Sequence, residues 1–240
     1  MEKLMLDRII SEIDFYHVIQ PIVDLKKHKI YGYEVLIRAD LFDSPESLFS
    51  YASKKNRLFD LDMKSIYMAF VTFKRDTKFM EDAPLFINVF PSTLTNPSFT
   101  KNLEKILKTL KVDPKSIVFE INRAEEFSNL SELKVIVSEL REQGFSIALD
   151  DVGKGESNLL SLLEISPDYA KIDLYFSKDL ATNIKKQKLI KLMQDLLGED
   201  TIMILEGLEE EEDLIKAMDL DVIYGQGYFL GKPKPLSYYL

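Results

Sequence analysis

The sequence predicts one α/β domain with a modified (β/α)8 barrel of the TIM-like kind, in which the first strand is antiparallel. Short apolar runs typical of buried strands alternate with longer segments of helical periodicity, and we count eight such strands. Strands that alternate with helices form parallel sheets, and eight of them in 240 residues are enough to close a barrel. No low-complexity linker interrupts the chain, so we expect a single domain over residues 1–240.

The first two predicted strands differ from the rest. They span 17–25 (HVIQPIVDL) and 30–38 (IYGYEVLIR), and the polar residues 26–29 are all that joins them. A parallel crossover needs about a dozen residues or more, so this pair must be an antiparallel hairpin.

The other elements follow from periodicity and from capping signals. Ser44-Pro45-Glu46 marks a helix start, with a capping side chain, a proline in the first turn and an acid at the positive end of the helix dipole. Gly144 marks a helix end. Further strands are expected at 85–90, 116–121, 145–151, around Lys171, at 202–206 and at 222–226. Helices are expected at 4–13, from 45, and at 58–73, 100–110, 125–143, 159–163, 178–197 and 209–218.

Composition excludes several kinds of site. The chain has no cysteine, which excludes disulfides and thiolate metal sites, and its two histidines, His17 and His28, cannot form a histidine-rich zinc centre. The net charge of -9 argues against DNA or RNA as a partner. No apolar run approaches the roughly 20 residues of a membrane span, and the N-terminus does not resemble a signal peptide. We therefore expect a cytoplasmic protein without a membrane partner.

Polar side chains mark the downstream end of nearly every predicted strand. In a closed barrel these ends meet at one mouth, and carboxylates gathered there repel one another unless cations bind. Their oxygens suit Mg²⁺, Mn²⁺ or Ca²⁺, and two such ions about 4 Å apart are a common device for attack on a phosphodiester. A blander interpretation of Asp150 or Asp151 alone is a cap on the next helix. The strand-end residues are Glu34, Asn88, Glu120, Asp150, Asp151, Lys171, Glu206 and Gln226.

These residues also carry a family resemblance. Glu34-Val35-Leu36-Ile37-Arg38 resembles the Glu-Ala-Leu-x-Arg motif of the EAL domain, a family that hydrolyses the bacterial second messenger cyclic di-GMP. The resemblance continues in order along almost the whole chain. It includes Gln20-Pro21, Asn88, Phe119-Glu120-Ile121, Leu149-Asp150-Asp151, Lys171-Ile172-Asp173, Glu206-Gly207-Leu208-Glu209 and Gln226-Gly227-Tyr228.

The resemblance implies roles for the matched residues. Glu34, Asn88, Glu120 and Asp150 would hold one ion of a two-ion Mg²⁺ or Mn²⁺ site, and Asp150 would bridge to the second with Asp151 and Glu206. Lys171 would position the attacking water, and Glu206 would act as the general base. The substrate-binding set would be Gln20, Pro21, Arg38, Glu209 and Gln226, of which Arg38 suits bidentate contact with a phosphate. The residue-level alternatives are a buried ion pair for Lys171 and Glu206 and a surface salt bridge for Arg38.

The chain departs from the family pattern beside the expected metal site. The family's Glu-Leu-Thr-Glu reads Glu120-Ile121-Asn122-Arg123, and its Asp-Phe-Gly-Thr-Gly-Tyr-Ser-Ser loop reads VGKGESN over 152–158 after Asp151. Phe90 replaces a serine, and Ala39 replaces an aromatic residue. In the family this loop lies against the metal site and contributes to dimerisation. We hypothesise that Arg123 and Glu156 form a salt bridge that keeps the altered loop ordered; the alternative is that both face solvent.

Three functions remain open. The first is metal-dependent hydrolysis of cyclic di-GMP to linear pGpG, slowed by the altered loop. The second is a receptor that binds cyclic di-GMP without useful turnover, and the third is a protein-interaction module. Outside the family, Lys171 on a barrel strand could be the Schiff-base lysine of an aldolase. We expect no sensor or cyclase domain, a homodimer, and regulation through expression, self-association or a separate protein partner.

Overall fold

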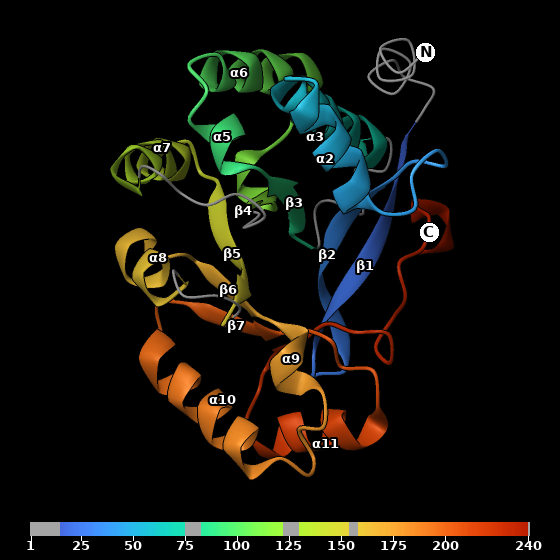
Figure 1. Ribbon diagram of the computed structural model, residues 1–240, viewed down its shortest axis with the longest axis vertical. Helices are drawn as coiled ribbons and strands as arrows, with labels where there is room; N and C mark the ends of the chain where they lie inside the picture. Colours follow the sequence, from blue (N-terminus) through green and yellow to red (C-terminus); the bar gives the residue numbers. More distant parts are fainter. Residues whose placement is uncertain (1–14, 75–82, 122–129, 154–157, 240) are drawn as a thin grey trace.

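The computed structural model describes residues 15–74, 83–121, 130–153 and 158–239. Within them, eight strands close into a barrel in the order of the sequence, from β1 to β8 (Figure 1). This confirms the predicted fold class. The strands are β1 (Tyr16–Asp24), β2 (Lys29–Arg38), β3 (Leu85–Val89), β4 (Ile117–Ile121), β5 (Ser146–Val152), β6 (Tyr169–Ile172), β7 (Ile202–Leu205) and β8 (Tyr224–Gly225).

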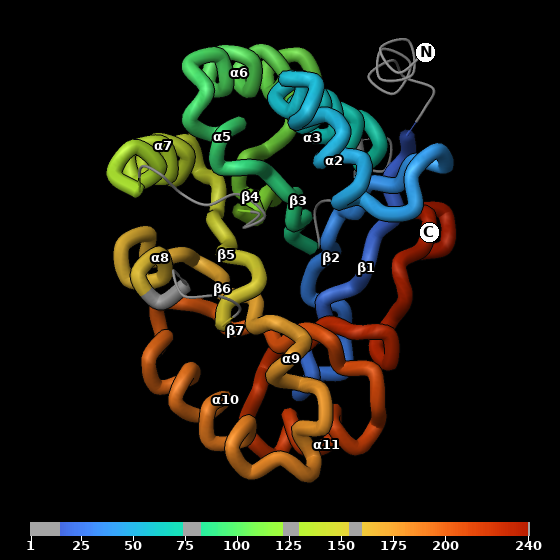
Figure 2. The backbone as a smooth tube through the Cα atoms, viewed as in Figure 1, coloured from blue at the N-terminus to red at the C-terminus, as the bar shows by residue number. Residues whose placement is uncertain are grey.

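β1 is antiparallel to both of its neighbours, whereas each pair from β2–β3 to β7–β8 is parallel. The hairpin register places Gln20 opposite Glu34. Beyond β8 the chain returns along β1, as the tube in Figure 2 shows, and Lys234 forms an antiparallel bridge with Ile19. β1 therefore has hydrogen-bonded neighbours on both sides, so it leaves no open sheet edge.

Helices surround the barrel (Figure 1). α3 packs beside α6, and α7 packs beside α8. Among the described residues, no helix combines the length and apolar character that crossing a bilayer requires. The α-helices are α2 (Pro45–Lys54), α3 (Leu58–Lys74), α5 (Pro91–Leu94), α6 (Phe99–Leu110), α7 (Leu130–Glu142), α8 (Asn158–Ile165), α9 (Leu174–Ser177), α10 (Ile184–Leu197) and α11 (Glu211–Asp219).

Two local capping predictions are confirmed. Ser44 caps α2 in a capping box, in which its hydroxyl accepts a hydrogen bond from the amide of Ser47. Gly144 follows α7 with a φ of +100°, a conformation that favours glycine. The helix expected at 4–13 and the first residues of the one expected at 125–143 lie outside the described residues.

The prediction of one helix over 178–197 is wrong at its start. α10 begins at Ile184, because the side chain of Asn183 accepts hydrogen bonds from the amides of Lys185 and Lys186. The strand expected at 222–226 is shorter than predicted and covers only Tyr224–Gly225. The amide of Val222 instead donates a hydrogen bond to the carbonyl of Ala217 at the end of α11. α5 and the short α9 were not predicted.

Alternation along the strands separates two parts of the core. Residues such as Leu85, Ile87 and Ile117 belong to the large cluster that packs with the helices. The alternate positions face the inside of the barrel and form a second cluster: Ile22, Phe86, Val118, Ala148, Tyr169 and Ile204. This apolar layer lies directly beneath the layer of polar side chains at the barrel mouth.

Candidate active site

On most strands, the polar side chain of the barrel mouth lies two residues from a side chain of the apolar layer. Glu120 follows Val118 on β4, and Lys171 follows Tyr169 on β6. Because side chains alternate across a strand with a period of two, these residues share the inner face of the barrel. Asn88, Asp150 and Glu206 follow the same rule from Phe86, Ala148 and Ile204. On the antiparallel β1 the direction is reversed, and Gln20 precedes Ile22.

Lys171 stands at the centre of this layer. Its side chain is 1% exposed, and Nζ lies 2.8 Å from a carboxylate oxygen of Glu120 and 2.8 Å from one of Glu206. The same nitrogen lies 3.2 Å from Glu34 and 3.6 Å from Asp150. Four acids from four different strand ends therefore converge on one buried ammonium group. The buried ion pair considered for Lys171 and Glu206 is present, but as part of this larger cluster.

Two amide side chains hold Glu34 in place. Asn88 on β3 donates a hydrogen bond of 3.1 Å to one carboxylate oxygen. Gln226, just after β8, donates one of 2.7 Å to the other, and this bond is buried. Since both oxygens are bonded, the orientation of Glu34 is fixed before any ligand arrives. The structure thus brings together residues separated by 192 positions in the chain.

The pKa values of the cluster reflect burial and mutual charge. Burial acts to lower the pKa of Lys171, but Glu120, Glu206 and the other acids hold it well above its ordinary value. Burial raises the pKa of Glu206 to about 8, against the effect of Lys171. Burial also raises the pKa of Glu120 well above its ordinary range, with further repulsion from Glu34. A Schiff-base lysine attacks as a free amine, so a lysine held protonated argues against an aldolase.

Glu34 shifts in the opposite direction. Burial acts to raise its pKa, but Lys171 and the hydrogen bonds from Gln226 and Asn88 outweigh burial and lower it. Glu34 is therefore the ionised partner of the central ammonium. The remaining acids are more numerous than the one positive charge can neutralise, which favours binding of further cations at this place.

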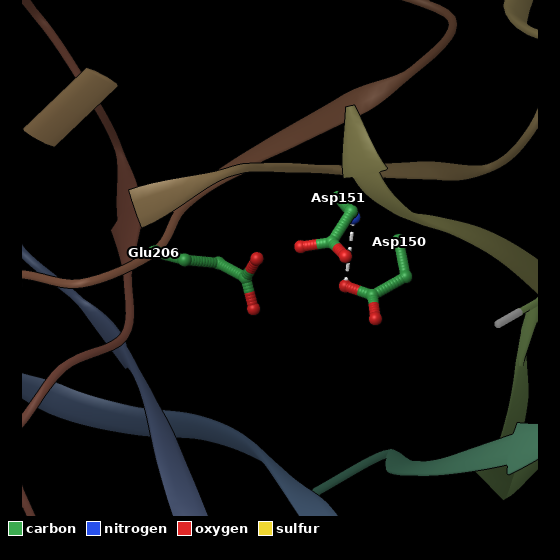
Figure 3. A group of neighbouring side chains, drawn as sticks. All are labelled: Asp150, Asp151 and Glu206. Carbon is green, nitrogen blue, oxygen red and sulfur yellow. Dashed lines mark hydrogen bonds between the residues drawn. The ribbon is translucent and has the colours of Figure 1, made fainter. Parts of the chain in front are cut away.

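Asp150, Asp151 and Glu206 form a group that could hold a metal ion. Ligand oxygens from the three carboxylates lie within 4.8 Å of one another. In Figure 3 the aspartates, from the end of β5, extend toward the same space as Glu206 from beyond β7. The register of β5 against β6 shifts between Leu149 and Val152, and Asp151 has a φ of +52°. Such a bulge can re-aim a side chain, which explains how two consecutive aspartates face one cavity.

The donor set fits hard divalent cations. Carboxylate and amide oxygens are the ligands that Mg²⁺ and Mn²⁺ prefer. Among the described residues, Oε2 of Glu120 and Oε1 of Gln226 are buried oxygens with no hydrogen-bond partner. Buried acceptors without partners are costly, and a cation provides one way to satisfy them. The carboxylate of Asp150 accepts a hydrogen bond of 2.9 Å from the amide of Asp151. The alternative of a cap on the next helix falls on the residues before α8, which lie outside the described residues.

A cavity of about 950 Å³ opens over these acids. Glu34, Asn88, Asp150 and Asp151 line one side of it. The helix α2 contributes six further lining residues: Pro45, Glu46, Phe49, Ser50, Ser53 and Lys54. The sequence analysis did not identify these α2 residues as part of a site, although their spacing of four residues is visible in the sequence.

The expected substrate-binding residues do not gather at one place as the acidic residues do. Gln20 is buried on β1 and donates to the carbonyl of Gly231, and Pro21 beside it packs against the same glycine. Arg38 donates to the carbonyl of Ile37 at 2.8 Å and is not among the residues that line the cavity. It forms no described salt bridge either, so neither interpretation of Arg38 is visible in its contacts. Glu209 is exposed just before α11. Arg123 and Glu156 lie outside the described residues.

Comparison with known proteins decides the family. The sequence profile of the EAL domain matches residues 4–233, which include every strand of the barrel and the whole acidic cluster. The chain belongs to the EAL domain family. In this EAL domain the family motif reads Glu34-Val35-Leu36, and its glutamate is the residue that Asn88 and Gln226 fix.

The EAL domain has curated relatives at moderate identity. It is 28% identical over 199 residues to the cyclic di-GMP phosphodiesterase PdeB of Shewanella oneidensis. This match covers 82% of this chain and 23% of that protein. It is 30% identical over 232 residues to the probable cyclic di-GMP phosphodiesterase PdeI of Escherichia coli, covering 93% of this chain and 29% of that protein. The chain spans about a quarter of the length of these relatives.

A solved structure resembles the EAL domain over nearly its whole length. The complex of BlrP1 from Klebsiella pneumoniae with calcium and cyclic di-GMP superposes with a TM-score of 0.80 at 25% identity. The match covers 92% of this chain and 56% of that one. The same protein is also known as a complex with manganese and cyclic di-GMP.

Proposed function

We propose that this EAL domain is a phosphodiesterase that hydrolyses cyclic di-GMP to linear pGpG with two divalent ions, Mg²⁺ or Mn²⁺. The observation that carries the proposal is the convergence of four carboxylates on Lys171, at the base of a cavity that Asp151 also lines. The names of the curated relatives and the ligands of the similar structure support the choice of substrate.

The proposed ion-binding residues are those of the acidic cluster. Glu34, Asn88, Glu120 and Asp150 would hold one ion, and Asp150 would share the second with Asp151 and Glu206. When bound, two such ions supply Lewis acidity and lower the pKa of a water molecule so that it can attack phosphorus. Gln226 acts through Glu34, whose carboxylate it orients.

The chain's own residues position the reacting groups. Lys171 is in place to donate a hydrogen bond to the attacking water, because its ammonium group already lies among the ligand oxygens. Glu206 is the proposed acceptor of that water's proton, since its carboxylate is next to both Lys171 and Asp151. Arg38 would grip a substrate phosphate after leaving the carbonyl of Ile37. Gln20, Pro21 and Glu209 are proposed contacts for the guanine and its surroundings.

The decisive experiment incubates the purified protein with cyclic di-GMP and Mn²⁺ or Mg²⁺ and separates the products by chromatography. We expect linear pGpG, and no product in EDTA. Binding of cyclic di-GMP without product would instead make the domain a receptor. Absence of both binding and turnover would leave the protein-interaction module. A cytoplasmic location, the homodimer and a regulatory protein partner stay predictions, of which sedimentation velocity tests the dimer.

A further inference from the structure

One face of α2 forms a wall of the cavity. The lining residues of this helix occur as the pairs 45–46, 49–50 and 53–54, one pair in each turn. Residues four apart lie on the same side of a helix, so the whole face is directed at the cavity rather than a single side chain. Buried residues on the other side, Leu48 and Ala52, anchor the helix to the core.

Phe49 is the aromatic residue of this wall, and a second ring supports it. The ring centroids of Phe49 and Phe90 lie 4.9 Å apart at an interplanar angle of 57°. Phe90 is 6% exposed, and its amide donates a buried hydrogen bond of 2.9 Å to the carboxylate of Asp62. Phe90 therefore has a fixed position, and both rings line the cavity, Phe49 from α2 and Phe90 from the residue after β3.

The two sides of the cavity differ in chemistry. Asp150, Asp151 and Glu34 make the lining at the strand ends acidic, whereas α2 contributes the aromatic surface of Phe49, the hydroxyls of Ser50 and Ser53 and the carboxylate of Glu46. Lys54 is the one cation among the described lining residues. A ligand that matches both sides carries a phosphodiester that can reach the acid-bound ions and a flat, polar ring system that can stack.

We propose that Phe49 is the base-stacking residue of this EAL domain, and that Phe90 sets its orientation, so that the α2 face favours phosphodiesters that bear a base. The inference rests on the proposed function for the identity of the diester. Stacking of a base on an aromatic ring is favourable for every base, because each presents a π-face. The α2 face therefore contributes affinity, while the acidic side contributes the chemistry.

The test measures the Kd of cyclic di-GMP by calorimetry in Ca²⁺ for the wild type and for substitutions of Phe49. Phe49→Ala should raise the Kd about 10-fold, the scale of one lost base stack. Phe49→Leu keeps an apolar side chain in the cluster but removes the aromatic face, and should raise the Kd nearly as much. Phe49→Tyr keeps the ring and should stay within about 2-fold of the wild type.

Phe42→Ala is the matched control. Phe42 packs against the same small core cluster as Phe49 and pairs with Tyr51 at 5.6 Å, but it does not line the cavity. Its substitution should cost stability without changing the Kd. The rise of the melting temperature in Mn²⁺ alone should be the same in Phe49→Leu as in the wild type, because Phe49 is no ligand of the ions.

The outcomes separate this inference from the proposed function. A Phe49→Leu variant that binds as tightly as the wild type, or a Phe42→Ala variant that weakens binding equally, overturns the stacking role. A wild type that binds cyclic di-GMP but forms no pGpG contradicts the phosphodiesterase proposal alone, and the Kd values still decide the role of Phe49. A wild type that does not bind cyclic di-GMP overturns both.

Discussion

The ammonium group of Lys171 lies 2.8 Å from Glu120 in an ion pair whose side chains are 1% and 0% exposed. Neither side chain can be solvated by water, so each depends on its neighbours. Removing one partner of a buried pair leaves an uncompensated charge, which costs more than the pair itself contributes. Lys171 therefore has a structural role in addition to the proposed catalytic one.

The first prediction follows from this pair. Lys171→Met should lower the free energy of unfolding by about 3–5 kcal/mol, because the ionised Glu34 loses its counter-ion and Glu120 loses its hydrogen-bond donor. Hydrolysis of cyclic di-GMP should fall about 100-fold or more. Urea unfolding in EDTA measures the stability, and Lys188→Met on the exposed side of α10 is the control, expected within about 0.5 kcal/mol of the wild type. Unchanged stability of Lys171→Met would contradict the central role of this ammonium.

The second prediction concerns Gly207, which follows Glu206 with a φ of +70°. A Cβ at this position would lie 2.4 Å from Cβ of Leu174, a separation that atoms do not tolerate. Gly207→Ala must shift the backbone beside Glu206, and a displacement of about 1 Å in a catalytic group can lower the rate about 100-fold. We expect kcat to fall on this scale, with Mn²⁺ present.

Gly198 provides the control for Gly207. It also has a positive φ, +62°, but a Cβ there would meet no atom within 4 Å. Gly198→Ala thus carries the backbone strain without the steric contact, and should lose about 1–3 kcal/mol of stability while kcat stays unchanged. Equal kcat values for the two alanine variants would mean that Gly207 does not position Glu206.

Much of the acidic cluster was predictable because parallel strands and their alternation are local properties. Glu120 and Lys171 belong to different strands, yet each follows a buried strand segment at the same end of the barrel. Once eight strands were expected to close, their ends had to meet. The partner of each side chain was not predictable, since the 2.7 Å bond from Gln226 to Glu34 depends on how β8 approaches β2 in space.

The parts that the sequence did not predict depend on contacts between distant elements. Asn183 caps α10, and the segment before that cap is held by Asp213 on α11, which accepts hydrogen bonds from the amides of Asp179 and Ala181. Periodicity within 178–197 contains no signal for that contact. Likewise, the spacing of Phe49 and Ser53 was visible, but only the packing of α2 shows that this face borders the cavity.

The third prediction is metal dependence, read from stability as well as from activity. Excess Mn²⁺ at about 100 times its Kd should stabilise the protein by about 2.7 kcal/mol and raise Tm by about 5 °C. Hydrolysis should stop in EDTA and return with Mg²⁺ or Mn²⁺, and excess Ca²⁺ should inhibit it. Glu120→Gln should lose the Mn²⁺-dependent rise, whereas Glu139→Gln, an exposed position on α7, should keep it. Full activity in chelator would exclude the two-ion mechanism.

The last prediction is a dependence of stability on pH through His17. This imidazole, on β1, lies 3.0 Å from the hydroxyl of Ser65 on α3, and burial lowers its pKa from 6.5 to about 4. Above pH 6.5 the ring is neutral in both the folded and the unfolded chain, so it has no effect on stability. Between pH 6.5 and 4 the unfolded chain takes up the proton first, and stability falls progressively.

His17→Gln removes this titration while keeping a side chain that can bond to Ser65. Relative to the wild type, the variant should gain stability as the pH is lowered from 7.5 to 4.5, by up to about 3 kcal/mol. Chemical denaturation at several pH values measures the difference. His28→Gln, in the exposed turn between β1 and β2, should follow the wild type throughout. If the stability curves of His17→Gln and the wild type ran parallel over this range, the half-buried imidazole would not be the group that titrates.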